Sequence, residues 1–299
     1  MDRLEAMSIL LTVAEAGSLS AGARRLDMPL ATVSRKVAEL EAHLKTRLLN
    51  RSSRKLTLTD TGQSYAAACR CILEEVDEAE RAASGEYHAP KGNLVITAPI
   101  VFGRLHVLQI AVEFLRAYPE IGIRLVLADH VINLLEDHID LAVRIGALPD
   151  SSLVARRIGQ IRRVVCASPI YFAEHGMPTK PDDLAAHDCI TFENLGSPST
   201  WTFTNGASEM SVPIRSRLSV NTAEAAIDAA IAGMGVTRVL SYQIADAVAA
   251  GTLVVGLEAF EPTPWPVSLV HSGQGILPLK VRAFLDFAAP RLRARLAGV

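Results

Sequence analysis

The sequence predicts an α/β protein in three parts: a small, mostly helical N-terminal region, one long helix, and a large region in which strands and helices alternate. Residues 18–41 have the apolar spacing of two short helices around a tight turn. Residues 60–83 keep an apolar repeat of alternating four and three residues. From Asn93 onward, short apolar segments typical of strands alternate with helical segments, which favours parallel βαβ units.

The N-terminal region predicts a helix-turn-helix. Apolar spacing places a first helix at residues 2–16, and Ser18 is expected to cap the second helix after Gly17 ends the first. Residues 27–29 supply the break. Pro29 has a fixed φ and no backbone N–H, so it fits the first turn of the third helix.

The third helix is predicted to bury one face and expose the other. Val33, Val37 and Leu40 fall at helical spacing on the buried face. The opposite face carries hydroxyls and cations that can reach phosphates and base edges in a major groove. With Ser18, these candidate DNA-binding residues are Thr32, Ser34, Arg35 and Lys36.

Charge distinguishes this reading from a small helical bundle with a solvated basic surface. Residues 20–55 hold nine cations against three anions, whereas the whole chain has a formal net charge of −2. A cationic segment in a slightly acidic protein is typical of a nucleic-acid contact, because neutralising phosphates supplies much of the affinity. We therefore expect double-stranded DNA as a partner.

A short two-stranded wing is predicted after the third helix, where LLNRSSRKLTLT alternates around Ser52-Ser53. Arg51, Arg54 and Lys55 lie near its tip and are expected to approach the DNA backbone or the minor groove. The alternative is a solvated hairpin.

The long helix carries an apolar seam. Thr59 or Asp60 is expected to cap it, with Asp60 and Gln63 as a capping box. The seam is too small to stabilise an exposed helix, so we expect it to pair with a second copy, the alternative being packing on its own domain. Its members are Tyr65, Cys69, Ile72, Val76, Ala79 and Ala83.

Three stretches of the N-terminal region, MDRLEAMSILLTVAEAGSLSAGARRL, VSRKVAELEAHLKTRLLNR and LTLTDTG, together resemble the start of a LysR-type transcriptional regulator. Pro29 and Ala31 stand where serines are common in that family. Later, ARRIGQIRRVVCASPIYFAEHG and PDDLAAHDCITF are close to the family's effector domain, which is two-lobed and periplasmic-binding-protein-like. The resemblance implies a dimerising linker helix, a tetramer, and RNA polymerase as a further partner if the protein is an activator.

The expected domains are a winged helix-turn-helix at residues 1–59, a linker helix at 60–88 and an effector-binding domain at 89–299. Within the last, lobe 1 covers about 92–162 and 267–299, and lobe 2 about 163–266. Helices are expected at 102–118, around 131–137, near 170–175, after Asn221 as N-cap, and at 279–289.

The second half is expected to bind a small molecule. Open α/β sheets bind ligands beyond the carboxyl ends of their strands, and two lobes would bring those ends together. Hydroxyls and helix-start N–H groups suit a carboxylate, and Trp201 suits an aromatic ring. Ordinary capping and strand-end chemistry is the alternative for each residue. The candidates are Thr97, Pro99, Asp129, Gly146, Trp201, Thr202, Asn221, Thr222 and Thr237.

Other functions have weaker support in the sequence. It contains no GxSxG, P-loop or GxGxxG, and its four cysteines match neither a zinc pattern nor a disulfide framework, so we expect no enzyme activity, metal or cofactor. The charged start and the lack of a long apolar run favour a cytoplasmic protein without a membrane partner. An enzyme or carrier built on the α/β lobes and a ligand-independent architectural DNA binder remain the competing hypotheses.

Overall fold

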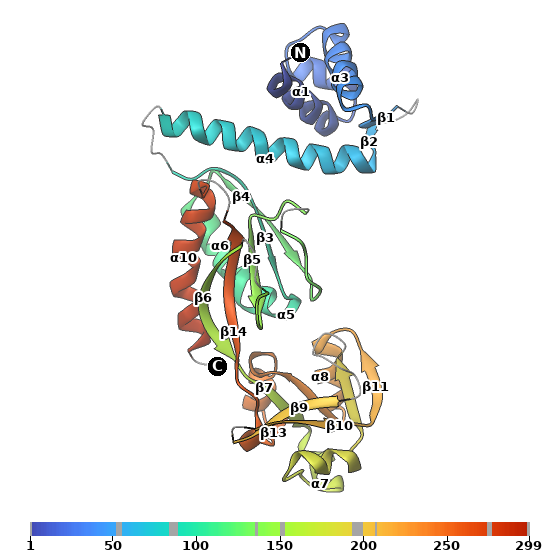
Figure 1. Ribbon diagram of the computed structural model, residues 1–299, viewed down its shortest axis with the longest axis vertical. Helices are drawn as coiled ribbons and strands as arrows, with labels where there is room; N and C mark the ends of the chain where they lie inside the picture. The colour runs from blue at the N-terminus through green and yellow to red at the C-terminus, as the bar shows by residue number, and fades with distance from the viewer. Residues whose placement is uncertain are drawn as a thin grey trace. The chain divides into compact units, whose positions relative to one another are not determined.

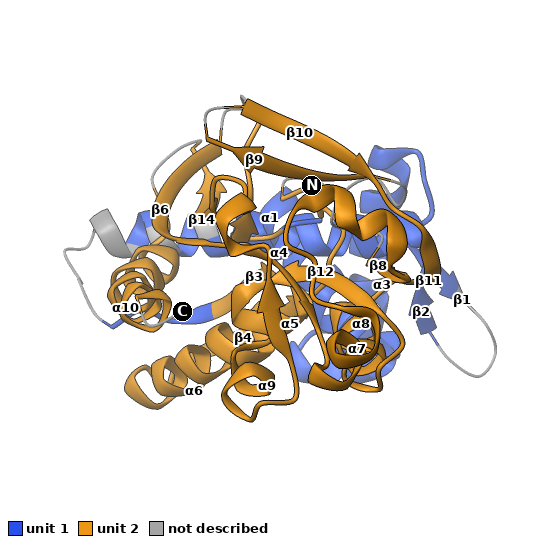
Figure 2. Ribbon diagram, turned by 90° about the horizontal axis from the view of Figure 1, so that it is seen from below, with its two compact units in different colours: residues 1–92, 135–138 blue, residues 93–134, 139–299 orange. Residues whose placement is uncertain are grey.

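The computed structural model describes residues 2–51, 56–83, 89–134, 137–149, 153–192, 200–206, 208–273 and 277–297. The chain forms two compact units (Figure 2). Unit 1 comprises residues 1–92 and 135–138, and unit 2 comprises residues 93–134 and 139–299.

Unit 1 contains the predicted helix-turn-helix (Figure 1). Its elements are α1 (Arg3–Ala16), α2 (Leu19–Arg25), α3 (Leu30–Leu44), the antiparallel strands β1 (Leu49–Arg51) and β2 (Leu56–Leu58), and α4 (Asp60–Ala83). One hydrophobic core joins them, with Leu10 of α1, Val37 of α3 and Leu48 before the first strand all fully buried. The helical apolar spacing therefore identified the faces that pack together.

Two expected helix starts in unit 1 need correction. Thr59 caps α4, because its Oγ1 accepts from the backbone N–H of Gly62 at 2.9 Å. The expected capping box of Asp60 is wrong, since the Gln63 N–H donates to the Thr59 carbonyl at 2.8 Å. Pro29 stands at the N-cap of α3 and not inside its first turn.

Unit 2 contains two five-stranded sheets. The first has the order β4-β3-β5-β14-β6, formed by Ile121–Leu127, Gly92–Ala98, Leu141–Ile145, Trp265–Ser272 and Leu153–Ile161. The second has the order β11-β8-β12-β7-β13, formed by Ser216–Val220, Cys189–Phe192, Val236–Leu240, Arg163–Ala167 and Val254–Gly256. A separate hairpin joins β9 (Thr200–Asn205) to β10 (Ser208–Pro213). The chain crosses between the sheets after β6 and again before β14.

Both sheets are mixed and not purely parallel. Strand β3 is parallel to β5, and β8 is parallel to β11 and β12, as βαβ units require. Strand β14 is antiparallel to β5 and β6, and β7 is antiparallel to β12 and β13. Each of these antiparallel pairs contains β7 or β14, the strands that follow the two crossings between the sheets.

The helices of unit 2 are α5 (Ile100–Phe102), the π-helical turn η1 (Gly103–Val107), α6 (Leu108–Ala117), α7 (Pro169–His175), α8 (Ala223–Ile231), α9 (Ala245–Ala249) and α10 (Leu279–Leu296). Short 3-10 turns are η2 (Pro181–Ala186), η4 (Ser241–Gln243) and η5 (Glu258–Phe260). In Figure 1, α6 and α10 lie side by side on the first sheet, and Phe114 contacts Phe284 with ring centroids 5.1 Å apart.

Three helix boundaries differ from expectation, and one expected helix is not formed in the residues described. The helix expected at residues 102–118 begins earlier, because α5 starts at Ile100. Residues 131–134, expected to be helical, are not helical, and Val131 is 85% exposed. Thr222, and not Asn221, caps α8 by accepting from the Ala225 N–H at 3.3 Å. Helix α10 continues past the expected end at residue 289, through Pro290, because its buried face extends to Leu296.

The second sheet is buried on both faces. Val164 and Cys166 of β7 belong to the main core, which also contains residues of the first sheet and of α8. Val165 and Ala167 alternate to the other face and join a second core beneath the hairpin. This second face also carries the arginines of the site described next.

Candidate nucleic-acid interface and effector site

The turn between α2 and α3 orients the predicted recognition helix. Gly17 ends α1 at φ 68°, and the Ser18 hydroxyl caps α2 by accepting from the Ala21 N–H at 3.0 Å. Asp27 adopts φ 52°, which reverses the chain before Pro29. The Ser18 oxygen accepts in the cap, so its O–H hydrogen remains available to a phosphate oxygen.

Adjacent cations on α3 have different environments. The Arg35 side chain is 62% exposed and pairs with Glu39 at 2.7 Å on the same helix. The Lys36 side chain is only 16% exposed and pairs with Glu5 of α1. We therefore revise the expected exposed position of Lys36, since its ammonium joins two helices. Thr32 and Ser34 are half-buried beside the buried Val33.

The wing is fixed to α3 by one carboxylate. Glu41 Oε1 accepts from the backbone N–H groups of Leu48 at 2.8 Å and Leu49 at 3.1 Å. Strands β1 and β2 pair as expected, and β1 ends at Arg51. Arg54, Lys55 and the side chain of Arg51 lie outside the described residues. An open depression of about 730 Å³ beside α3 is lined by Asp2, Arg35, Lys36, Glu39, Ala42 and His43.

The seam of α4 divides into two halves. Tyr65 packs against the helix-turn-helix core, and Cys69 is fully buried. Further along, Ile72 is 38% exposed and Ala79 is exposed, while Val76 is half-buried. The first half thus packs on its own domain, and the second half leaves apolar side chains at least partly exposed. The side chain of Ala83 is not among those described.

The candidate residues of the first sheet gather at one edge, where β3, β4 and β5 end and β14 begins. Thr97 is 2% exposed, and Pro99 is the N-cap of α5. The Asp129 carboxylate accepts from the Ile100 N–H at 3.0 Å, so an internal anion already occupies this helix start. Gly146 has φ 109°, and its N–H donates to the Pro266 carbonyl at 2.9 Å.

The candidates of the second sheet do not form one group. Thr222 caps α8 and Asn221 is exposed beside it. Thr237 is fully buried and donates to the Ile190 carbonyl at 3.1 Å, so its hydroxyl already has a partner. Trp201 is 3% exposed in the second core, so its ring is packed against the protein in this structure.

Two arginines that were not among the predicted effector-binding residues lie near them. The Arg163 guanidinium is 4.4 Å from the ring centroid of Trp265, and that of Arg238 is 5.3 Å from the ring centroid of Trp201. Arg238 is 5% exposed, and its Nη1 donates to the Thr202 carbonyl at 3.2 Å.

Burial raises the cost of charge at both arginines. Burial lowers the pKa of Arg163, and the negative charge of Glu209 partly offsets this decrease. Burial and the neighbouring Arg163 lower the pKa of Arg238 to about 10. Both groups remain cationic near neutral pH. Arg163 Nε is buried without a hydrogen bond, and among the described residues we find neither a hydrogen bond nor an ion pair of this guanidinium.

Arg163 lies next to the edge of the first sheet at which a ligand is expected to bind. Trp265 begins β14, pairs with Ile161 at the end of β6, and would lie 3.9 Å from a Cβ at Gly146. Arg163, Trp265 and Gly146 therefore form one cluster at the crossing between the sheets. Among the described residues no group of His, Cys, Asp and Glu side chains is arranged to hold a metal ion.

The chain matches two family models. Residues 4–63 match the bacterial regulatory helix-turn-helix protein of the lysR family, and residues 88–293 match the LysR substrate binding domain. The chain belongs to the LysR family: it is a DNA-binding transcriptional regulator with an effector-binding domain, and not an enzyme.

Full-length relatives have the same organisation. An HTH-type transcriptional repressor of Pseudomonas aeruginosa is 34% identical over 289 residues, which covers 96% of this chain and 91% of the relative. The transcriptional activator AaeR of Escherichia coli is 31% identical, covering 96% and 93%. The structure of the LysR-type regulator CrgA from Neisseria meningitidis is similar at TM-score 0.62 and 32% identity, covering 96% and 98%. In the described part of this chain, no single helix is long and apolar enough to span a membrane, although α1 and α2 together, bent by 116°, meet that length and composition test.

Proposed function

We propose that this regulator senses a small aromatic organic acid at the crossing between the two lobes of its effector domain. The observation that carries the proposal is the half-buried Arg163 guanidinium, which stacks on Trp265 and has no hydrogen-bond or ion-pair partner among the described residues. Charges withdrawn from water in proteins are normally paired, so this half-buried guanidinium, near the Glu209 carboxylate but not hydrogen-bonded to it, is our candidate position for an anion.

The chemistry of the cluster selects the ligand class. A guanidinium binds a carboxylate through two parallel N–H donors, and Arg238 adds a second positive charge nearby. The half-buried Trp265 offers an aromatic surface beside Arg163. The start of α5 already holds the Asp129 carboxylate, so we place the ligand's acid group at Arg163 and not at that helix start.

Thr97 is proposed as a further contact. It lies at the end of β3 and exposes 2% of its surface, and no hydrogen-bond partner of its hydroxyl is found among the described residues. Thr97→Val keeps its shape and removes the hydroxyl. We expect this change to weaken binding of the ligand and to leave DNA binding in the absence of ligand unchanged.

The proposal is tested by a thermal-shift screen of the full-length protein with benzoate, salicylate, succinate and the neutral benzamide. Stabilisation by an aromatic carboxylate that Arg163→Met abolishes is the expected result. The control is Arg162→Met, because Arg162 is the adjacent arginine and pairs with Glu261 at 3.1 Å. Stabilisation by benzamide alone, or a carboxylate response that survives Arg163→Met, would contradict an acid site at Arg163.

We further propose that the protein acts in the cytoplasm as a tetramer. The exposed half of the α4 seam supports a dimer through this helix, and pairing of effector domains, as the family resemblance implies, would complete the tetramer. The domain boundaries given above and the contacts of Ser18, Thr32, Ser34 and Arg35 with DNA are part of the same proposal. RNA polymerase is the further partner if the protein activates transcription.

A further inference from the structure

One aromatic side chain of the second lobe reaches into the first lobe. Tyr242 of η4 is 3% exposed, and its ring centroid lies 5.4 Å from that of Phe102 and 5.6 Å from that of His106. Phe102 and His106 also contact each other at 4.8 Å. Burial raises the pKa of Tyr242, while hydrogen bonds with Gln243 and with the Phe102 backbone oppose that rise.

The first lobe meets Tyr242 with a π-helical turn. In η1 the Leu108 N–H donates to the Gly103 carbonyl, five residues earlier. This wider turn is rare and is found mostly as a single insertion at functional sites. A Cβ at Gly103 would lie 2.2 Å from Leu127 Cδ2, so a larger residue at this position would require the Leu127 side chain to move.

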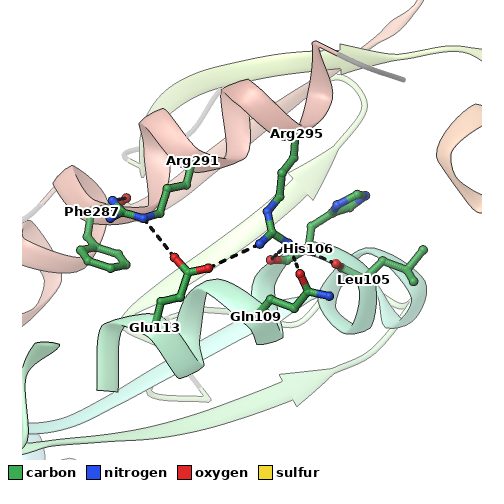
Figure 3. Close-up of polar contacts among 7 residues, drawn as sticks. All are labelled: Leu105, His106, Gln109, Glu113, Phe287, Arg291 and Arg295. Carbon is green, nitrogen blue, oxygen red and sulfur yellow. Dashed lines mark hydrogen bonds and ion pairs between the residues drawn. The ribbon is translucent and has the colours of Figure 1, made fainter. Parts of the chain in front are cut away.

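Arg295 of α10 holds the π-helical turn (Figure 3). Its Nη1 donates to Gln109 Oε1 at 2.7 Å and to the carbonyls of Leu105 at 3.4 Å and His106 at 3.5 Å. Its Nη2 pairs with Glu113 at 3.6 Å. The carbonyls of a π-helical turn depart from the usual helical pairing, so donors from a neighbouring helix stabilise it.

Arg291, one turn earlier on α10, provides a natural comparison. Its Nε pairs with the same Glu113 at 3.2 Å, and its Nη1 donates to the Phe287 carbonyl of its own helix at 2.9 Å (Figure 3). Among the described residues, Arg291 has no hydrogen bond or ion pair with η1. The two arginines thus share a carboxylate, but only Arg295 holds the turn.

One nitrogen of His106 opposes this contact. Its Nε2 is buried without a hydrogen-bond partner, and burial, aided by Arg295, lowers its pKa and keeps the ring neutral. A buried nitrogen without a partner costs free energy that exposure to water would recover. Aromatic packing on Tyr242 therefore favours the contact, and the unsatisfied nitrogen opposes it.

We propose that Tyr242 and the η1 turn form a latch between the lobes, with Arg295 as its positioning residue. The opposing contributions bring the latched and released arrangements close in free energy, so a ligand with a modest preference for one arrangement can shift their populations. The latch rests on the proposed function, since it gives the effector site a second arrangement to select. An ion pair of Arg104 with Glu224, 3.8 Å long and exposed, also crosses between the lobes.

The test is hydrogen exchange of the full-length protein without any ligand. Arg295→Met is expected to speed amide exchange about tenfold in residues 103–110 and also in residues 238–246 of the other lobe. Arg291→Met removes a matched charge and should leave residues 238–246 unchanged. Faster exchange confined to the first lobe would overturn the latch, because it would make Arg295 a purely local support.

A second variant tests the opposing contribution of His106. His106→Phe keeps an aromatic ring and removes the unpartnered nitrogen, so exchange in both segments should slow about tenfold. Unchanged or faster exchange would overturn the latch. Because no ligand is added, the exchange measurement does not depend on the effector. A thermal-shift screen in which no acid binds would refute the proposed effector, but it would not refute the latch.

Discussion

Arg35→Ala should reduce site-specific DNA affinity with little effect on folding. The Arg35 guanidinium is largely exposed on α3, and its one described partner is Glu39 in the next helical turn. Exposed pairs at this spacing contribute about 0.3–0.5 kcal/mol, so truncation should lower the free energy of unfolding by no more than that. A lost base contact costs about 1–3 kcal/mol, which corresponds to about 5- to 150-fold in the dissociation constant.

The assay is fluorescence anisotropy with the cognate duplex and a scrambled duplex at several salt concentrations. We expect Arg35→Ala to weaken the cognate complex by that factor and to spare the scrambled complex. Specific contacts and phosphate contacts fail differently, because phosphate contacts act on every sequence and set the salt dependence. Equal losses on the two duplexes would refute a base contact by Arg35.

Lys36→Met is the matched control, because Lys36 is the adjacent cation and its mostly buried ammonium pairs with Glu5 of α1. This variant should lower the free energy of unfolding and leave the preference for the cognate over the scrambled duplex unchanged. If Lys36→Met instead removes that preference, the revised structural role of Lys36 is wrong.

Two further predictions concern assembly and pH. Ile72→Asp places a charge in the exposed half of the α4 seam, so sedimentation should show a smaller assembly and DNA affinity should fall, whereas an unchanged mass would show that the seam packs elsewhere. His187 is 5% exposed, and its Nδ1 has no hydrogen-bond partner among the described residues. Burial, and to a smaller extent the charge of His175, lowers the pKa of His187, and burial also lowers the pKa of His106. A histidine whose folded-state pKa lies below its unfolded value of about 6.5 stabilises the protein above that pH and loses this contribution as the pH falls, so urea unfolding should be easier at about pH 5.5 than at pH 7. His187→Phe should shrink this difference, and an unaltered difference would exclude His187 as its source.

The sequence predicted the elements whose evidence is local. The faces of α1 and α3 follow from helical apolar spacing, and the turn before Pro29 follows from its residue types. A pattern of this kind cannot distinguish a regular helix from one that contains a π-helical turn, so η1 was missed. The segment at 131–134 has apolar spacing, but its residues do not form a helix.

The effector site was predicted only in part, because its chemistry depends on strand pairing. Thr97 and Gly146 follow from the rule that ligands bind beyond strand ends. Arg163 and Arg238 lie on one face because β7 and β12 pair with Arg238 opposite Val165 and Leu240 opposite Arg163. Residues 75 positions apart in the chain give no local signal of this register. The burial of Trp201 could not be predicted for the same reason, since it depends on the hairpin packing onto the sheet.

Lys36 illustrates the same limit in the DNA-binding region. Its position on α3 places it beside the exposed Arg35, but its partner Glu5 is 31 residues away on α1. Whether a surface cation contacts DNA or another helix is decided by packing between elements, which helical periodicity alone does not specify.

Site-specific binding of DNA by a symmetric assembly can be measured by sequencing the genomic fragments that the purified protein selects at 0.15 M salt, near the physiological ionic strength. We expect a few enriched fragments that share a pseudo-palindrome with half-sites about 34–36 Å apart, or a multiple of that distance. Even recovery of fragments across the genome, without a shared sequence, would contradict it.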